Sequence, residues 1–150
     1  MFSRRDCAIA LVAACTTLAT VAWAQSAGKP ALHSTFFNWD RLKAEETPTG
    51  AKRNIFIDRT ATLDQLSCHA TTVNAGMASH APHKHVEEEL IIVKDGTFEV
   101  MQNGKISKVG PGAVIFEASN EMHGMRNVGE TPGTYFVVKF WPPGMLSAQQ

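Results

Sequence analysis

The chain has 150 residues, a length typical of one domain, and 44% of them are hydrophobic. Its 14 basic and 14 acidic residues balance, so it lacks the basic excess that marks proteins with a nucleic-acid partner. The hydrophobic content allows one compact core but is too small for a protein that crosses a membrane several times. These totals argue against nucleic-acid binding and against stable membrane insertion of the folded domain.

Residues 1–24 are predicted to be an export signal rather than part of the fold. A short basic start, MFSRRDC, precedes the apolar run AIALVAACTTLATVA, and Ala22–Ala24 offers a small-x-small cleavage pattern. The run is short for a membrane span, and a retained anchor is the alternative. Cleavage after Ala24 would leave a periplasmic or secreted protein. Only Cys68 would then remain, which we interpret as a small buried residue without a disulfide.

Two further patterns concern the export route. Arg4 and Arg5 resemble the pair in a twin-arginine signal, which exports folded proteins. The letters VAAC at residues 12–15 resemble a lipobox, which would make Cys15 a lipidated N-terminus. The apolar run continues well past Cys15, so we rank a lipid anchor second.

Residues 25–53 are predicted to form an N-terminal arm. Asn38 or Asp40 can start a short helical turn, and Thr47–Gly50 breaks it. The aromatic residues of this arm would dock it on the domain body or on a second subunit; they are Phe36, Phe37 and Trp39.

Residues 54–141 are predicted to be all-β. About eight short strands at spacings of about 8–12 residues, with no convincing long helix, are typical of a β-sandwich or barrel. Asn103-Gly104 predicts a two-residue hairpin, and Asp95-Gly96 predicts a second turn. Residues 142–150 are expected to form a C-terminal tail.

The stretch HAPHKHVEEELIIVKDG, residues 80–96, places three histidines and three glutamates ahead of an apolar run. Alternate residues of a strand face the same side, so a regular strand would put His83, His85 and Glu89 on one face. The apolar run Leu90–Val93 indicates that this strand enters the core. Two imidazoles and a carboxylate there need a compensating partner, which a divalent metal supplies.

A fourth candidate ligand, His123, follows the predicted strand AVIFEAS. Imidazoles with one carboxylate suit Mn, Fe, Co, Ni, Cu or Zn. A structural zinc site is usually closed and rich in thiolate, whereas Cys68 lies elsewhere in the sequence. We therefore expect one divalent transition metal in an octahedral site with open positions, Mn or Fe first, with Ni, Zn and Cu as alternatives.

The spacing of these residues resembles the first motif of the cupins. Six residues separate Gly76 from His83-x-His85, three more lead to Glu89, and another six lead to Gly96. The first spacer is one residue longer than the common form of the motif.

The second cupin motif is matched at Gly112, His123 and Asn127, although Ala118 and Asn120 replace its proline and glycine. The resemblance covers about residues 54–141 and implies a double-stranded β-helix, or jelly-roll, barrel. It also implies a homodimer and a metal bound by the four ligand positions, which are His83, His85, Glu89 and His123.

Other polar residues near the motifs have two interpretations each. Glu87 and Glu88 are expected to be solvated, although Glu87 could lie at the barrel mouth as an outer carboxylate. His80 is either a surface residue or an acid/base beside the metal. His69 would line the pocket or lie satisfied in the core, and strand parity from His123 turns Arg126 away from the cavity.

The resemblance implies a small organic molecule as substrate or ligand, and it does not fix the reaction. An enzyme of this kind could be a dioxygenase, decarboxylase, lyase or isomerase, whose metal polarises a carbonyl or activates O2. His80 and Glu87 would then move protons. The alternative is a binding or metal-sequestering module without turnover, which needs no positioned acid/base. A purely structural barrel is the third interpretation.

Overall fold

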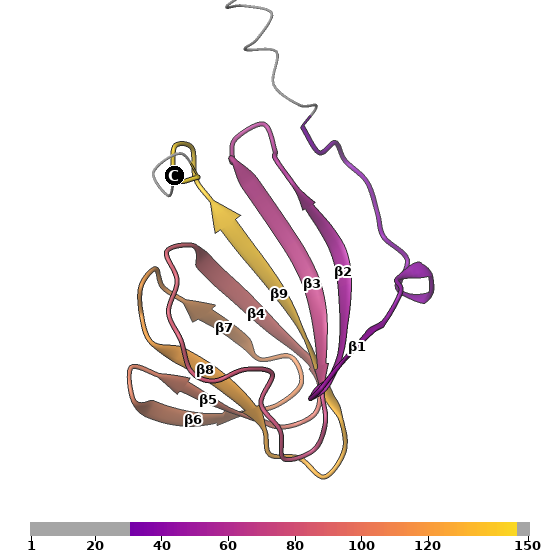
Figure 1. Ribbon diagram of the computed structural model, residues 1–150, viewed down its shortest axis with the longest axis vertical. Coiled ribbons are helices and arrows are strands. Elements are labelled where there is room, and N and C mark those ends of the chain that lie inside the picture. Colours follow the sequence, from indigo (N-terminus) through magenta and orange to yellow (C-terminus); the bar gives the residue numbers. More distant parts are fainter. Residues whose placement is uncertain (1–30, 147–150) are drawn as a thin grey trace, which may run out of the picture. The chain divides into compact units, whose positions relative to one another are not determined.

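The computed structural model describes residues 31–146, in which nine strands form two antiparallel sheets (Figure 1). The expectations about residues 1–24, including the signal, its two arginines and Cys15, lie outside the described residues. The larger sheet has the order β1-β2-β3-β9-β4-β7. Its strands are β1 (Glu45–Thr47), β2 (Gly50–Asp58), β3 (Gln65–Val73), β9 (Gly133–Trp141), β4 (Glu88–Asp95) and β7 (Val114–Glu117).

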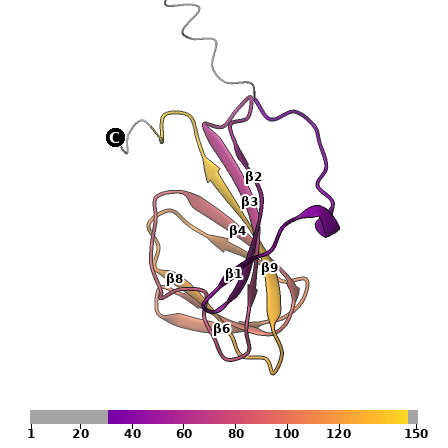
Figure 2. The same ribbon diagram turned by 45° about the vertical axis from the view of Figure 1, so that its right-hand side comes forward.

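The smaller sheet has the order β6-β5-β8 and lies opposite the larger one (Figures 1 and 2). Its strands are β6 (Lys105–Val109), β5 (Phe98–Gln102) and β8 (His123–Asn127). The all-β barrel expected from strand spacing is therefore confirmed. Within the part of the chain described by the structure, no helix is both long and apolar enough to cross a membrane.

The core lies between the two sheets and follows the two-residue alternation of the strands. In β9, Tyr135 and Val137 are buried, while Phe136 between them and Val138 after them are only partly buried. Each large apolar side chain buried in this way stabilises the fold by about 1.5–3 kcal/mol. The buried cluster consists of Val73, Ile91, Val93, Phe98, Val100, Ile115, Met125, Tyr135 and Val137.

Both predicted turns are present, with different roles. Asn103 (φ 48°) and Gly104 (φ 84°) form a two-residue loop that joins β5 to β6 in one sheet. Gly96 (φ 89°) instead leads the chain from β4 in the larger sheet to β5 in the smaller. A Cβ atom on Gly96 would lie 2.6 Å from the Cα atom of Gly133, so the turn requires glycine for space as well as for conformation.

The arm begins the larger sheet earlier than the sequence predicted. We expected strands from residue 54, but β2 starts at Gly50 and pairs with β1 through the predicted break, so that Thr47 lies opposite Gly50. A chain that reverses at a tight turn can pair with itself on both sides, which makes the break a hairpin. A short 3-10 turn, Trp39–Arg41, precedes it, with Asn38 as the residue before its start.

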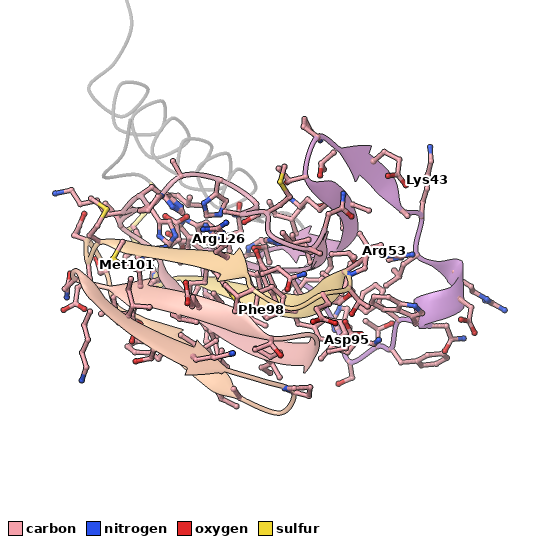
Figure 3. The ribbon with its side chains drawn as sticks, turned by 90° about the horizontal axis from the view of Figure 1, so that it is seen from below. Lys43, Arg53, Asp95, Phe98, Met101 and Arg126 are labelled. Atoms are coloured by element: carbon pink, nitrogen blue, oxygen red, sulfur yellow. The ribbon has the colours of Figure 1, made fainter. Side chains whose placement is uncertain are left out.

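Two aromatic residues of the arm pack on the domain body. Phe37 stacks on Phe56 of β2 with ring centroids 5.4 Å apart, and Trp39 meets Phe136 of β9 edge-on at 5.8 Å. The guanidinium of Arg53 lies 4.7 Å from the Trp39 ring, at the end of the molecule opposite Met101 (Figure 3). Phe36 does not dock and is 81% exposed.

Candidate metal centre

His83, in the first cupin-like motif, and His123, in the second, form an isolated antiparallel β-bridge. The backbone N–H of each residue donates to the carbonyl of the other at 2.9 Å. His123 is the first residue of β8, in the smaller sheet, whereas Glu88 begins β4, in the larger sheet. The regular strand that we expected through His83 and His85 is therefore wrong, because the chain crosses between the two sheets at this point.

Three imidazoles nevertheless converge. His83, His85 and His123 each offer a nitrogen within 4.8 Å of the others. Their ring centroids are 4.7 to 5.3 Å apart, and His123 is buried at 3% exposure. The backbone crossing thus brings together the three histidines that the motifs singled out.

Backbone carbonyls orient two of these rings. The Nδ1–H of His123 donates to the carbonyl of Glu121 at 2.9 Å, and that of His85 donates to the carbonyl of Glu87 at 2.8 Å. A ring that donates from Nδ1 can present the lone pair of Nε2 to a metal, an arrangement common among metal-binding histidines.

Two buried ring nitrogens support a metal site directly. His123 Nε2 and His83 Nδ1 have no hydrogen-bond partner among the described residues. An unpaired buried polar atom costs about 1–3 kcal/mol, and a bound cation would supply the missing partner. Neutral imidazoles are also the ligands that suit first-row transition metals. The residues present therefore fit the divalent metal expected from the sequence.

Glu89 lies beside the imidazoles on the inner face of β4 and is 7% exposed. Its Oε2 atom is 3.1 Å from Nε2 of His85 and 3.2 Å from Nζ of Lys139. The fourth expected ligand is therefore near the three histidines, and its carboxylate points at His85 and Lys139.

Lys139 is one residue of this site that sequence reasoning missed. It lies opposite Glu89 in the pairing of β9 with β4, and its ammonium also contacts His85 Nε2 at 3.2 Å and Glu87 Oε1 at 3.1 Å. The available signal was parity: Lys139 shares the inner face of its strand with Tyr135 and Val137. A lysine on the buried face of an apolar strand needs a partner.

Glu87 and Glu88 differ, although both were expected to be solvated. Glu88 is exposed, whereas Glu87 is partly buried and held by Lys139. Burial acts to raise the pKa of Glu87, but a backbone hydrogen bond and the pair with Lys139 outweigh it, so the pKa lies below its ordinary value. Glu87 is thus an ionised carboxylate at the edge of the site.

Another acidic residue, Glu117, was not singled out in the sequence. It lies on β7 opposite Glu89 and is 2% exposed. Burial raises its pKa, and the side-chain amide of Gln102 donates to it at 2.9 Å. Glu117 therefore lies next to the site as a hydrogen-bonded buried carboxyl.

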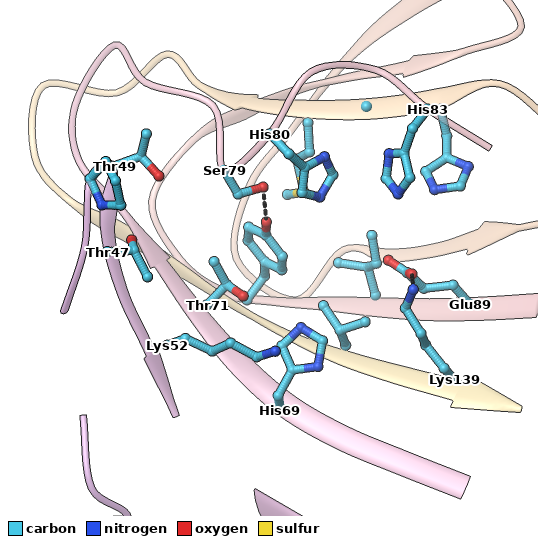
Figure 4. Close-up of a pocket in the computed structure, with 17 residues that line it drawn as sticks. Thr47, Thr49, Lys52, His69, Thr71, Ser79, His80, His83, Glu89 and Lys139 are labelled. Carbon is cyan, nitrogen blue, oxygen red and sulfur yellow. Dashed lines mark hydrogen bonds and ion pairs between the residues drawn. The ribbon is translucent and has the colours of Figure 1, made fainter. Parts of the chain in front are cut away.

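His80 and His69 both line the cavity. His80 is exposed, and its ring meets the ring of His83 edge-on at 4.3 Å between centroids. His69 points into the cavity from β3 (Figure 4). Burial, followed by the charge of Lys52, lowers the pKa of His69 to about 4, so this imidazole is neutral near pH 7.

The cavity has a volume of about 380 Å³, toward the lower end of the range for small-molecule sites. Figure 4 shows His80 and His83 on one wall, Glu89 with Lys139 at one end, and Lys52 beside His69 toward the other. A second cavity of about 410 Å³ shares Lys52, His69 and Lys139 with the first.

Other residues near the two motifs either support the cavity or face away from it. Arg126 is exposed and donates to the carbonyl of Gly76 at 3.1 Å, as parity from His123 predicted. Asn127 is fully buried and ties down the turn after β8. Met125 lines the cavity, whereas Met77 and Met122 are 43% and 40% exposed and do not.

Comparisons with solved structures find the same fold in other proteins. An RmlC-like cupin from Shewanella frigidimarina is 16% identical, with a TM-score of 0.60, covering 76% of this chain and 96% of its own. The polyketide cyclase RemF from Streptomyces resistomycificus is 23% identical, with a TM-score of 0.59 over 74% and 82% of the two chains. A predicted oxalate decarboxylase from Thermotoga maritima is 19% identical, with a TM-score of 0.59 over 71% and 99%.

Comparison with curated protein sequences finds no significant match. Residues 70–139 match the family described as the cupin domain, and this segment includes all four expected ligands. With the two opposed sheets and the solved structures of the same fold, this match shows that the chain contains a cupin domain.

Proposed function

We propose that this protein is a metal-dependent enzyme that acts on a small organic molecule through proton transfer, as a decarboxylase, lyase or isomerase does. The observation that carries this proposal is the presence of further ionisable side chains in the cavity beside the three imidazoles. His80, His69 and Lys139 all line it. A module that only bound a metal would need no such groups.

Three histidines would hold the metal: His83, His85 and His123, with Glu89 as the carboxylate ligand. Bound there, a divalent metal would supply Lewis-acid stabilisation of negative charge on the substrate. The nitrogen and oxygen donors favour Mn or Fe in our proposal, with Ni, Zn and Cu as competitors.

The protein's own residues would manage the protons. His80 is exposed at the cavity wall and touches the ring of His83, so its imidazole can take a proton from a substrate or return it. Glu87, ionised and held by Lys139, would serve as an outer carboxylate at the mouth. Ile91, Met125 and Val137 line the same cavity and would exclude water from the substrate.

Two measurements test this proposal. Elemental analysis of protein matured by its own export route is expected to find about one transition metal per chain. His123→Ala should weaken metal binding by more than the roughly 100-fold that changes outside the ligand sphere can cause. Metal content that is unchanged in His123→Ala and His83→Ala would contradict the assignment of the site.

Turnover separates the enzyme from a binding module. A screen of small organic molecules with the metal-loaded protein should find one that is converted, and His80→Gln should lower kcat while leaving the metal content intact. Stoichiometric binding without conversion would instead support the binding module. Elemental analysis of His80→Gln is the control that separates a lost acid/base from a lost metal.

We also propose that the protein is exported, with cleavage after Ala24, and that the twin-arginine route allows the metal to be loaded before export. This rests on Arg4, Arg5 and the apolar run that follows. Lysine at both arginine positions should block export or change the resident metal. If export and metal identity stay unaltered, the route is wrong.

A further inference from the structure

The end of the cavity that contains Lys52 is built from one row of residues across the larger sheet. Lys52 of β2 lies opposite Thr71 of β3, and Thr71 lies opposite Tyr135 of β9. Side chains directly opposite each other share a face of the sheet. All three line the cavity, and we call this group, together with His69 and Ser79, the lysine end.

The lysine end lies apart from the candidate metal ligands. Tyr135 belongs to the lysine end, and Lys139 pairs with Glu89. The two residues are four positions apart on β9. Four residues of a strand span ~13 Å, so the two rows lie at different ends of one cavity. Figure 4 shows the same arrangement, with Lys52 and His69 toward one end and Glu89 and Lys139 at the other.

The two lysines of the cavity differ in their partners. Lys139 has Glu87 and Glu89 within 3.2 Å, so two carboxylates already surround its ammonium. Lys52 forms no ion pair with any acidic residue that the structure describes, although it is partly buried. Glu45 lies opposite Lys52 in the pairing of β1 with β2, but its Oε2 atom accepts from the side-chain amide of Asn54 at 3.4 Å. No ion pair among the described residues therefore neutralises the ammonium of Lys52.

The residues that line the cavity beside Lys52 are neutral and can form hydrogen bonds. The hydroxyl of Tyr135 donates to Oγ of Ser79 at 3.0 Å, which leaves the hydroxyl hydrogen of Ser79 for a ligand. His69 is neutral because burial and the nearby ammonium lower its pKa to about 4. The lysine end thus combines one cation with uncharged donors, a combination that suits an anion of one charge.

We propose that the lysine end binds a carboxylate of the substrate, with Lys52 as its counter-ion and Thr71, Ser79 and His69 as neutral partners. The substrate is then a small organic acid whose carboxylate lies away from the group that reacts beside the imidazoles. This inference rests on the proposed function, because it places the two ends of one molecule in one cavity.

Binding measurements on the metal-loaded protein test the lysine end. The probes are short linear oxo acids, each compared with its neutral primary amide by isothermal titration calorimetry. The wild type should bind the best acid at least about ten-fold more tightly than its amide, because only the acid pairs with the ammonium. Lys52→Gln should remove this preference, and Lys52→Arg should keep it, because the positive charge remains.

Lys108→Gln is the matched control, since Lys108 is exposed on β6 and its loss changes the net charge equally. It should leave the preference unchanged. The proposal for the lysine end is refuted if the wild type shows no preference for the acids. It is also refuted if Lys52→Gln retains this preference, because Lys52 would then behave as a solvated surface lysine that does not contact the ligand.

Metal content, measured on each variant, separates this inference from the proposed function. If Lys52→Gln binds metal normally and loses only the acid preference, both stand. If the wild type holds metal but does not distinguish acid from amide, the lysine end alone fails. If the wild type holds no metal, the proposed function fails, and the acid preference can still be measured on the metal-free protein.

Discussion

The Nζ atom of Lys139 lies 3.2 Å from the Oε2 atom of Glu89, the residue directly opposite it in the pairing of β9 with β4. The same ammonium reaches Glu87 at 3.1 Å, so one lysine pairs with two carboxylates beside the imidazoles. A divalent cation held by the histidines and Glu89 would meet this ammonium as a like charge. The lysine therefore supports the metal-free site electrostatically and opposes the metal.

Replacing Lys139 tests this relationship. Lys139→Met should lower the free energy of unfolding of the metal-free protein by about 1–3 kcal/mol, because it leaves charged hydrogen bonds without a donor. It should also tighten metal binding, because a like charge is removed. Chemical denaturation and a metal titration by calorimetry measure the two effects.

Lys94→Met is the control for Lys139→Met. Lys94 pairs with Asp95 at 2.8 Å, but both side chains are 45% exposed, so the loss should stay below about 1 kcal/mol. Weaker metal binding in Lys139→Met would contradict the prediction and show that the lysine holds Glu89 in place for the metal.

The stability of the metal-free protein should depend on pH through His69. Its pKa is lowered from 6.5 to about 4, chiefly by burial, so between these values the unfolded chain binds more protons than the folded one. The free energy of unfolding should therefore fall as pH drops from about 6.5 to about 4, by at most ~1.4 kcal/mol per pH unit from this group.

His69→Gln provides the comparison for this pH dependence. Denaturation at several pH values, with a chelator present, should give a shallower slope for His69→Gln than for the wild type. His83, whose pKa is also lowered by burial first, retains its own contribution in both proteins. Equal slopes would mean that His69 is open to water in solution.

Alanine substitutions at Gly96 and Gly104, compared with each other, separate the cost of backbone strain from the cost of steric crowding. Both glycines have positive φ, at 89° and 84°, so alanine is strained at either position. A Cβ atom at Gly96 would lie 2.6 Å from backbone of Gly133, whereas nothing lies within 4 Å at Gly104. Gly104→Ala should cost about 1–2 kcal/mol and Gly96→Ala about 3 kcal/mol or more, measured by denaturation. Equal losses would show that the Gly96 turn can move apart from Gly133.

Asn127 should matter for the fold and not for the metal. Its side-chain amide donates to the carbonyls of Val73 and Thr131 at 2.8 and 2.9 Å, and its oxygen accepts from the N–H of Gly129 at 2.9 Å. Asn127→Ala leaves these buried groups without partners and should cost about 3 kcal/mol. The metal-to-protein ratio of the folded fraction should remain that of the wild type.

Asn38→Ala is the control for Asn127→Ala. Asn38 is exposed and makes no side-chain capping bond, so its loss should change stability by no more than about 0.5 kcal/mol. A folded Asn127→Ala protein that loses metal would show that Asn127 also positions His123.

The sequence alone determined the features that depend on neighbours along the chain. Two-residue alternation marked the inner faces of the strands, and Asn103-Gly104 specified its hairpin, because turn geometry depends on adjacent residues. The spacing of the two motifs singled out His83, His85 and His123, which the fold brings within 4.8 Å. The same spacing indicated a cupin barrel, and the match of residues 70–139 to the cupin domain confirms it.

Only the tertiary structure decided which charged residues share the cavity with those histidines. Lys139 and Lys52 lie in strands paired with partners distant in sequence, and the β2–β3 register shifts between Asn54 and Phe56. Strand parity could indicate that Lys139 faces inward, but the register between strands distant in sequence decides which residues a lysine meets, so no local pattern could place these lysines beside the histidines. The crossing of His83 and His85 between the sheets was hidden for the same reason, because it depends on pairing with His123 about forty residues later.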